Sequence, residues 1–265
     1  MRSPVTPARL VRSEWRKLWS LRSTRWICAG VVLGQSVLTA LLAAITDLSE
    51  LGYPADRVGP ELINAMYPAA QLAIPVLAVL AITGEYSTGT IRSTFAAAPR
   101  RTGTVVAKGL VLAVTALLTG AAASLLTWAL LIPRLGTVYA IRPGDPTHLR
   151  LLLAMPLYLA GIALFGYGIG LVVRRTAPAL GIVLATFLVV DTLAMMLQRI
   201  RLVEVLTPFL PAAAGTRLLT SDSGPAIMSA QDVVVLGPWQ GWGVLLGWAA
   251  VVLVAGLVLV RRRDA

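Results

Sequence analysis

The sequence predicts an all-α, polytopic membrane protein with six transmembrane helices. Of its 265 residues, 57% are hydrophobic and 13% are charged, whereas soluble domains carry about 25% charged residues. The mean hydropathy is +0.79. Apolar runs near the roughly 20 residues needed to cross a bilayer lie at about 26–46, 64–83, 105–132, 151–173, 177–197 and 241–260. We therefore expect one transmembrane domain covering residues 1–265.

Residues 1–25 are basic and precede the first apolar run, with Glu14 as their single acid. On a helical wheel one half is apolar (Leu10, Val11, Trp15, Leu18, Trp19, Leu21) and the other is polar (Arg9, Arg12, Arg16, Lys17, Ser20). This pattern predicts an amphipathic helix that lies in the membrane interface, with Trp15, Lys17, Leu18 and Trp19 at its centre. A cleaved signal peptide is the alternative, but its apolar region would be shorter than this run of about 20 residues.

Basic residues predict the orientation, because cytoplasmic loops carry an excess of Lys and Arg. With the amino terminus inside, sixteen of the 23 basic residues fall on that side: 7 before the first run, 4 within 84–108, 2 at 174–175 and 3 at 261–263. Both termini are therefore expected in the cytoplasm. Lys108 lies in the first turn of the third run, where its side chain can extend to the interface.

The stretch GEYSTGTIRSTFAAAPRR, residues 84–101, is a polar interruption between two apolar runs. Its charged residues would each cost about 2.5 to 3.5 kcal/mol at the centre of a membrane helix, so it lies outside the hydrocarbon. The near-helical spacing of Glu85, Tyr86, Thr88 and Arg92 predicts a short surface helix of about three turns. A connector that only fixes topology is the alternative on residue chemistry alone.

The same stretch, followed by VVAKG, resembles the loop after the second span in type-2 ATP-binding-cassette transporter permeases of bacteria. The matching positions are Glu85, Tyr86, Gly89, Thr90, Ile91, Arg92, Pro99, Arg100, Arg101, Ala107 and Lys108. In that family the loop is a coupling helix that enters a cleft of the ATPase subunit. The resemblance implies that residues 84–104 form the coupling loop, with Glu85, Tyr86, Thr88, Gly89, Thr90 and Arg92 at the contact. Glu85 and Arg92 would be the charges that meet the partner.

Within residues 198–240, the stretch VEVLTPFLPAAAGTRLL has about a dozen apolar residues broken by Pro208 and Pro211. It is too short and too broken for a seventh span, which favours a re-entrant or interfacial segment over an ordinary outer loop. Two short stretches again resemble the permease family: PFLPAAAG, which includes Gly215, and GPWQGW before the last span. In that family, re-entrant helices between spans five and six cap the path on the outer side.

Small residues four apart predict close helix contacts. Gly166 and Gly170 form such a pair in the fourth run, and Gly243 and Gly247 form one in the sixth. Packing within one subunit is favoured, and a dimer seam is the alternative.

Catalytic patterns are scarce in this sequence. It contains no GxxxxGK[ST] phosphate loop, so ATP-driven work requires a partner chain that binds ATP and Mg. His148 is the single histidine and Cys28 the single cysteine, so neither a metal nor a cofactor site is expected in this chain. Asp191 lies inside the fifth run and is either a functional acid or a group paired near the interface.

Together the resemblance and the missing ATPase motif imply a non-enzymatic permease subunit of an exporter in the bacterial plasma membrane. The implied partners are an ATPase subunit, a second permease subunit in a homodimer, and the lipid bilayer, with no nucleic acid. A non-transporting membrane anchor or immunity-type protein is the alternative, and a channel is a more distant one.

Overall fold

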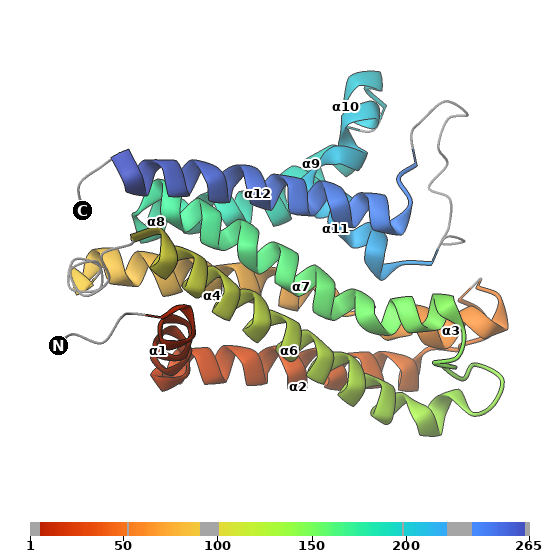
Figure 1. The fold of residues 1–265 in the computed structure, drawn as a ribbon. Coiled ribbons are helices and arrows are strands. Elements are labelled where there is room, and N and C mark those ends of the chain that lie inside the picture. Colours follow the sequence, from red (N-terminus) through yellow and green to blue (C-terminus); the bar gives the residue numbers. More distant parts are fainter. Residues whose placement is uncertain (1–5, 52, 91–100, 198, 222–234, 263–265) are drawn as a thin grey trace.

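The computed structural model describes residues 6–262 except 52, 91–100, 198 and 222–234. Over these residues the chain is helical and has no strand. Among them, six segments are long and apolar enough to cross a membrane: Arg22–Ile45, Ala55–Ser87, Thr102–Leu135, Pro146–Val173, Thr176–Ala194 and Pro238–Arg262. The prediction of an all-α, multi-pass membrane protein is confirmed at this level. Both chain ends lie at the same end of the bundle in Figure 1, which agrees with an even number of crossings.

The chain begins with two helices set at an angle to each other, α1 (Pro7–Ser20) and α2 (Arg22–Ile45). Leu21 separates them with an extended backbone, φ −75° and ψ 125°. Figure 1 shows α1 lying across the bundle at the end that carries both termini. Leu18 of α1 is buried while Arg12 and Arg16 are exposed. The predicted two-sided helix is therefore present and faces the bundle with its apolar half.

The second span extends further than the sequence predicts. After α3 (Ala55–Leu62), helix α4 runs from Tyr67 to Ser87, so Glu85 belongs to its last turn. Thr88 ends α4, and Gly89 follows with φ +71°, a left-handed conformation that favours glycine just after a helix. The predicted surface helix does not begin at residue 84, because residues 84–87 continue the second span. Residues 91–98 of that predicted helix lie outside the described residues.

Helices α6 (Arg101–Leu135), α7 (Pro146–Val173) and α12 (Pro238–Arg262) form the centre of the bundle together with α4. Helix α7 packs against all three of the others and contributes the most buried large side chains, including Tyr158, Ile162 and Leu171. Asp145 caps its first turn by accepting hydrogen bonds from the backbone N–H groups of Thr147 and His148, at 2.7 and 3.2 Å. This central helix fixes the positions of its neighbours.

The two glycine pairs differ in their surroundings. A Cβ at Gly166 would lie 2.7 Å from the carbonyl oxygen of Pro75, and one at Gly170 would meet Ile82. This pair therefore allows α7 to approach α4 closely, as expected for packing within one chain. At Gly243 and Gly247 a Cβ would meet nothing within 4 Å in the described part of the chain.

Helix α12 uses a different face from the one expected. Its buried positions are Gly241, Leu245, Ala249, Gly256 and Val260, which follow a spacing of four or seven residues. Gly243 and Gly247 lie on the opposite face, because a shift of two residues turns a helix by about 200°. The expectation that they pack within this chain is therefore not met among the described residues, where both glycines are exposed.

The fifth span is interrupted by a π-helical turn. It consists of α8 (Thr176–Leu184), η1 (Ala185–Val190) and α9 (Asp191–Met196), whereas the sequence predicts one regular helix over 177–197. The carbonyl of Phe187 in η1 accepts a hydrogen bond of 2.9 Å from Nε2 of Gln71, and Tyr158 donates its hydroxyl proton to Oε1 of Gln71. One hydrogen bond from α4 therefore supports the irregular backbone, and Tyr158 of α7 holds the donating side chain in place.

A bent pair of short helical segments precedes the last span. Arg201–Phe209, which comprises α10 (Arg201–Leu206) and η2 (Thr207–Phe209), meets Pro211–Leu219, which comprises α11 (Pro211–Thr216) and η3 (Arg217–Leu219), at 57°. Figure 1 shows α10 standing away from the bundle while α11 lies beside α12. A Cβ at Gly215 would lie 2.7 Å from the ring of Tyr158, so this glycine permits the close contact with α7.

Candidate functional site

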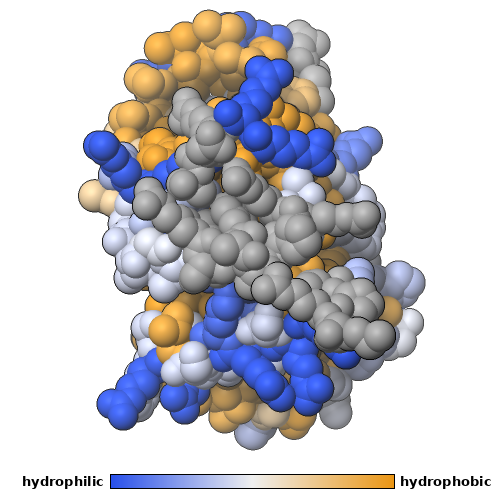
Figure 2. All heavy atoms as spheres, turned by 60° about the vertical axis from the view of Figure 1, so that its left-hand side comes forward, coloured by the Kyte–Doolittle hydropathy of each residue, from blue (hydrophilic) through white to orange (hydrophobic). Residues whose placement is uncertain are grey.

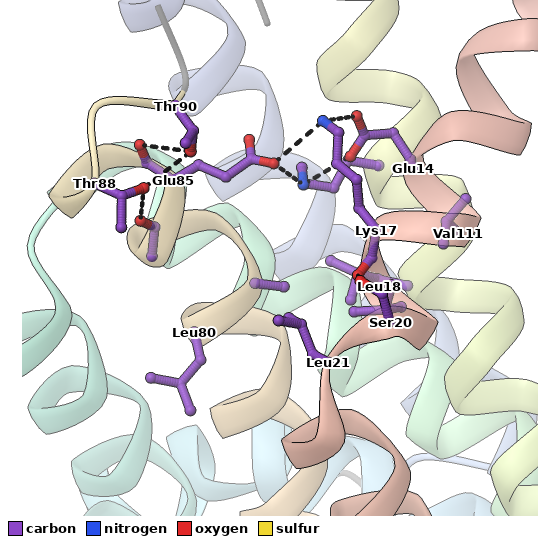
Figure 3. Close-up of a pocket in the computed structure, with 14 residues that line it drawn as sticks. Glu14, Lys17, Leu18, Ser20, Leu21, Leu80, Glu85, Thr88, Thr90 and Val111 are labelled. Carbon is purple, nitrogen blue, oxygen red and sulfur yellow. Dashed lines mark hydrogen bonds and ion pairs between the residues drawn. The ribbon is translucent and has the colours of Figure 1, made fainter. Parts of the chain in front are cut away.

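Four charged side chains from three helices meet at the end of the bundle that carries both termini. Glu14 and Lys17 come from α1, Glu85 from the last turn of α4, and Lys108 from the start of α6. Nζ of Lys108 lies 2.8 Å from Oε1 of Glu85 and 2.7 Å from Oε2 of Glu14. Nζ of Lys17 lies 2.5 Å from Oε1 of Glu14 and 3.4 Å from Oε1 of Glu85. Figure 3 shows Glu14, Lys17 and Glu85 pointing toward one another, and we call these three side chains together with Lys108 the charge cluster.

The members of the charge cluster differ in their exposure to solvent. The side chain of Glu14 is 2% exposed, Lys108 9%, Glu85 15% and Lys17 42%. Two carboxylates and two ammonium groups cancel in formal charge, and buried charges are tolerated only when they are paired in this way. The contact between Lys108 and Glu14 is an ion pair by distance without hydrogen-bond geometry. The cluster therefore joins α1 to the bundle through ion pairs around one shared cation.

Lys17 is the accessible member of the charge cluster. Partial burial lowers the pKa of Lys17, but its hydrogen bond to Glu14 and the nearby Glu85 carboxylate outweigh this effect and raise the pKa above the usual lysine value. Lys17 therefore remains charged at physiological pH. Figure 2, in which this end of the molecule is turned forward, shows hydrophilic side chains gathered over its lower part.

A cavity of about 370 Å³ opens beside the charge cluster, between α1, α4 and α6. Its polar lining consists of Glu14, Lys17, Ser20, Glu85, Thr88, Thr90 and Lys108, and the remaining lining residues are Leu18, Leu21, Leu80, Ala81, Gly84, Val111 and Leu112. Figure 3 shows Leu21 and Leu80 on the side away from the ion pairs. The cavity thus has one charged end and one apolar end.

Some of the residues predicted to contact an ATPase subunit contact their own chain instead, and others are exposed. Glu85 points into the charge cluster and pairs with side chains of its own chain. Tyr86 is partly buried and its ring lies 5.3 Å from the guanidinium carbon of Arg174. Thr88, Gly89 and Thr90 are exposed at the end of α4. Arg92 lies outside the described residues.

The residues predicted at the centre of the interfacial helix make two kinds of contact, apolar packing and ion pairs. Leu18 is 6% exposed and belongs to the main hydrophobic core, which also contacts Trp15. The rings of Trp15 and Trp19 lie 5.8 Å apart. Lys17 contacts the carboxylates of the charge cluster, so α1 is held to the bundle by apolar packing and by ion pairs.

Glu14 and Lys108 are the members of the charge cluster that the sequence analysis missed. Glu14 counted only as one acid among many basic residues, and the side chain of Lys108 was expected to extend to the interface. A signal for Glu14 was present, because it stands four residues from both Leu10 and Leu18 and so lies within the apolar half of α1. An acid on that face needs a buried cation, and Lys108 is the first basic residue within the predicted apolar runs.

The other residues that could carry chemistry are His148, Cys28 and Asp191. His148 is 4% exposed, and its Nδ1 accepts a hydrogen bond of 3.0 Å from the backbone N–H of Arg142. Within the described residues no group of three His, Cys, Asp or Glu side chains is placed to hold a metal ion. Cys28 is buried. The side chain of Asp191 lies outside the described residues.

Comparisons with known proteins gave no match to this chain, either among protein-family models or among curated proteins. The resemblance to type-2 permeases therefore rests on the quoted residues alone.

Proposed function

We propose that this chain is the permease subunit of an ATP-binding-cassette exporter in the bacterial plasma membrane. In this proposal both termini and residues 84–104 face the cytoplasm, and a separate ATPase subunit supplies the energy. Two permease chains assemble around the translocation path, because six spans enclose too little space to shield a large solute. The bent pair formed by Arg201–Phe209 and Pro211–Leu219 is the re-entrant segment on the outer side.

The observation that carries the proposal is the contact between the two ends of the resembled motif. Glu85 stands at its beginning and Lys108 at its end, and their side chains form an ion pair of 2.8 Å. The ion pair therefore joins the last turn of α4 to the start of α6, at the end of the bundle where α1 lies. A push from a partner docked on residues 84–104 would therefore be carried to both α4 and α6.

The charge cluster extends this mechanical connection to α1. Lys108 forms ion pairs with Glu85 of α4 and with Glu14 of α1. A displacement of the loop that shifts Glu85 or Lys108 therefore also acts on α1. Because α1 continues into α2 after Leu21, the first span would move with it during the transport cycle.

The test is recovery of the ATPase with the purified permease. If a neighbouring gene encodes an ATPase with a phosphate loop, the chain is co-expressed with that ATPase, and Arg92→Glu is compared with the unaltered chain. Loss of a partly buried ionic contact costs about 1 to 3 kcal/mol, so recovery should fall about 5- to 150-fold. Arg175→Glu is the matched control, because Arg175 is an exposed arginine at the same end of the bundle.

Both variants should insert normally, because both positions are predicted to lie outside the hydrocarbon. Equal recovery of the ATPase with both variants would refute the proposed coupling role of the loop. Absence of any ATPase-dependent activity in the unaltered chain would favour the non-transporting anchor instead.

A further inference from the structure

The cavity between α1, α4 and α6 combines features that suit an amphiphilic ligand. Its charged end holds the charge cluster, and its apolar end is formed by side chains such as Leu21 and Leu80. Leu21 is 50% exposed and Leu80 is 38% exposed, so the apolar end is open to the surroundings. A small polar solute would gain nothing from these leucines, whereas an acyl chain would bury them.

The accessible charge in the cavity is positive. Both carboxylates are turned into ion pairs, and Glu14 is almost fully buried, while Lys17 exposes 42% of its side chain. Arg16 and Arg22, the sequence neighbours of the lining residues Lys17 and Leu21, are also exposed. An approaching ligand therefore meets cations first, and a phosphate group is the complement.

We propose that this cavity binds the phosphate headgroup and the first acyl carbons of an anionic membrane phospholipid. The phosphate lies against the Nζ of Lys17, and the acyl chains leave past Leu21 and Leu80 into the bilayer. The volume of about 370 Å³ holds a headgroup and a few methylenes but not a whole lipid, which agrees with the open apolar end. The bound lipid touches α1 and α4 together and so stabilises the docked position of α1.

This site is independent of the proposed export function, because it needs only a bilayer and the described residues. The experiment is native mass spectrometry of the purified full chain in detergent, titrated with phosphatidylglycerol. Phosphatidylcholine with the same acyl chains tests the headgroup charge, and inorganic phosphate tests the need for acyl chains. The dissociation constant for phosphatidylglycerol should be about 10-fold lower than that for phosphatidylcholine, because the choline cation of phosphatidylcholine offsets its phosphate and is repelled by Lys17.

A substitution that fills the cavity locates the site without changing any charge. Gly84 lines the cavity, and a Cβ there would meet nothing within 4 Å, so Gly84→Leu occupies the ligand space. Gly30→Leu is the matched control, because Gly30 of α2 is equally unobstructed but lies outside the cavity. Phosphatidylglycerol should bind Gly30→Leu normally and Gly84→Leu at least about 10-fold more weakly. Leu80→Trp fills the same space if Gly84→Leu does not fold.

Several outcomes would overturn the proposal. Equal affinity of the Gly84→Leu and Gly30→Leu chains for phosphatidylglycerol would show that the lipid does not bind in the cavity. Equal affinity for the two lipids would exclude recognition of the anionic headgroup. Displacement of the lipid by inorganic phosphate would indicate a free phosphate site. A change from dimer to monomer on Gly84→Leu substitution would assign the cavity to a second copy of the chain.

Discussion

Removing Lys108 should release α1 from the bundle. Nζ of Lys108 contacts Glu14 at 2.7 Å and Glu85 at 2.8 Å, and the Glu14 side chain is only 2% exposed. Breaking a buried ion pair by deleting one partner costs about 3 to 5 kcal/mol. We expect Lys108→Met to destabilise the docked position of α1 by about 3 kcal/mol, the lower end of this range. The cost is not larger because Lys17 still donates a hydrogen bond to Glu14 at 2.5 Å.

The assay is the rate of trypsin cleavage within α1, which contains Arg12 and Arg16. When opening is fast relative to cleavage, this rate follows the population of undocked α1. A loss of about 3 kcal/mol corresponds to a rate about 150-fold higher. Arg175→Met, which removes an exposed cation elsewhere, should leave the rate unchanged.

A double variant separates ion pairing from packing. Glu14→Leu combined with Lys108→Met removes both buried charges and leaves Lys17 beside Glu85, 3.4 Å apart. Replacing a buried pair with apolar side chains is often neutral or stabilising, so the double variant should be cleaved more slowly than Lys108→Met alone. Additive effects of the two substitutions, or unchanged cleavage of Lys108→Met, would refute the role assigned to the charge cluster.

Three further predictions concern other parts of the chain. A cysteine replacing Asp56 should react with a membrane-impermeant label in intact cells while one replacing Arg262 should not, and the reverse pattern would contradict the proposed orientation. Gln71→Leu should lower the free energy of unfolding by about 1 to 2 kcal/mol in a detergent titration, because the π-helical turn loses its donor; an unchanged value would show that the turn needs no support. Backbone N–H groups of His148 and Thr147 lower the pKa of Asp145, so its contribution to stability is present above the unfolded pKa of about 3.9 and is lost as the pH falls further. The difference in thermal midpoint between Asp145→Ala and the unaltered chain should therefore be present at neutral pH and shrink below about pH 4; a constant difference would contradict this reasoning.

Hydropathy was sufficient to predict the fold class and the approximate spans. Each predicted run overlaps a helix in the structure, because about 20 apolar residues in succession have few alternatives to a buried helix. The predicted ends were less accurate. α4 continues to Ser87, since a polar residue such as Glu85 can remain helical once its charge is paired.

The packing face of α12 shows a second limit of sequence reasoning. The spacing of Gly243 and Gly247 matched a small-residue contact motif, yet Gly241 and Gly256 make the contacts. Several glycines on different faces of one helix satisfy the same spacing rule, so the rule does not select a face. Only the neighbouring helix, here α7 with Leu171 against Gly256, determines which one is used.

The position of Glu85 changes how substitutions in the resembled motif must be interpreted. On the sequence alone, Glu85 is a loop charge available to a partner, and its reversal would test docking without disturbing the fold. In the structure its carboxylate accepts from Lys108 at 2.8 Å, so Glu85→Arg would place three cations around the carboxylate of Glu14. Loss of activity in that variant would therefore follow from a displaced α1 even if the ATPase never touched residue 85. Docking should therefore be judged from Arg92→Glu, because Arg92 is the other charge that the resemblance assigns to the ATPase contact, while Glu85→Gln reports on the attachment of α1.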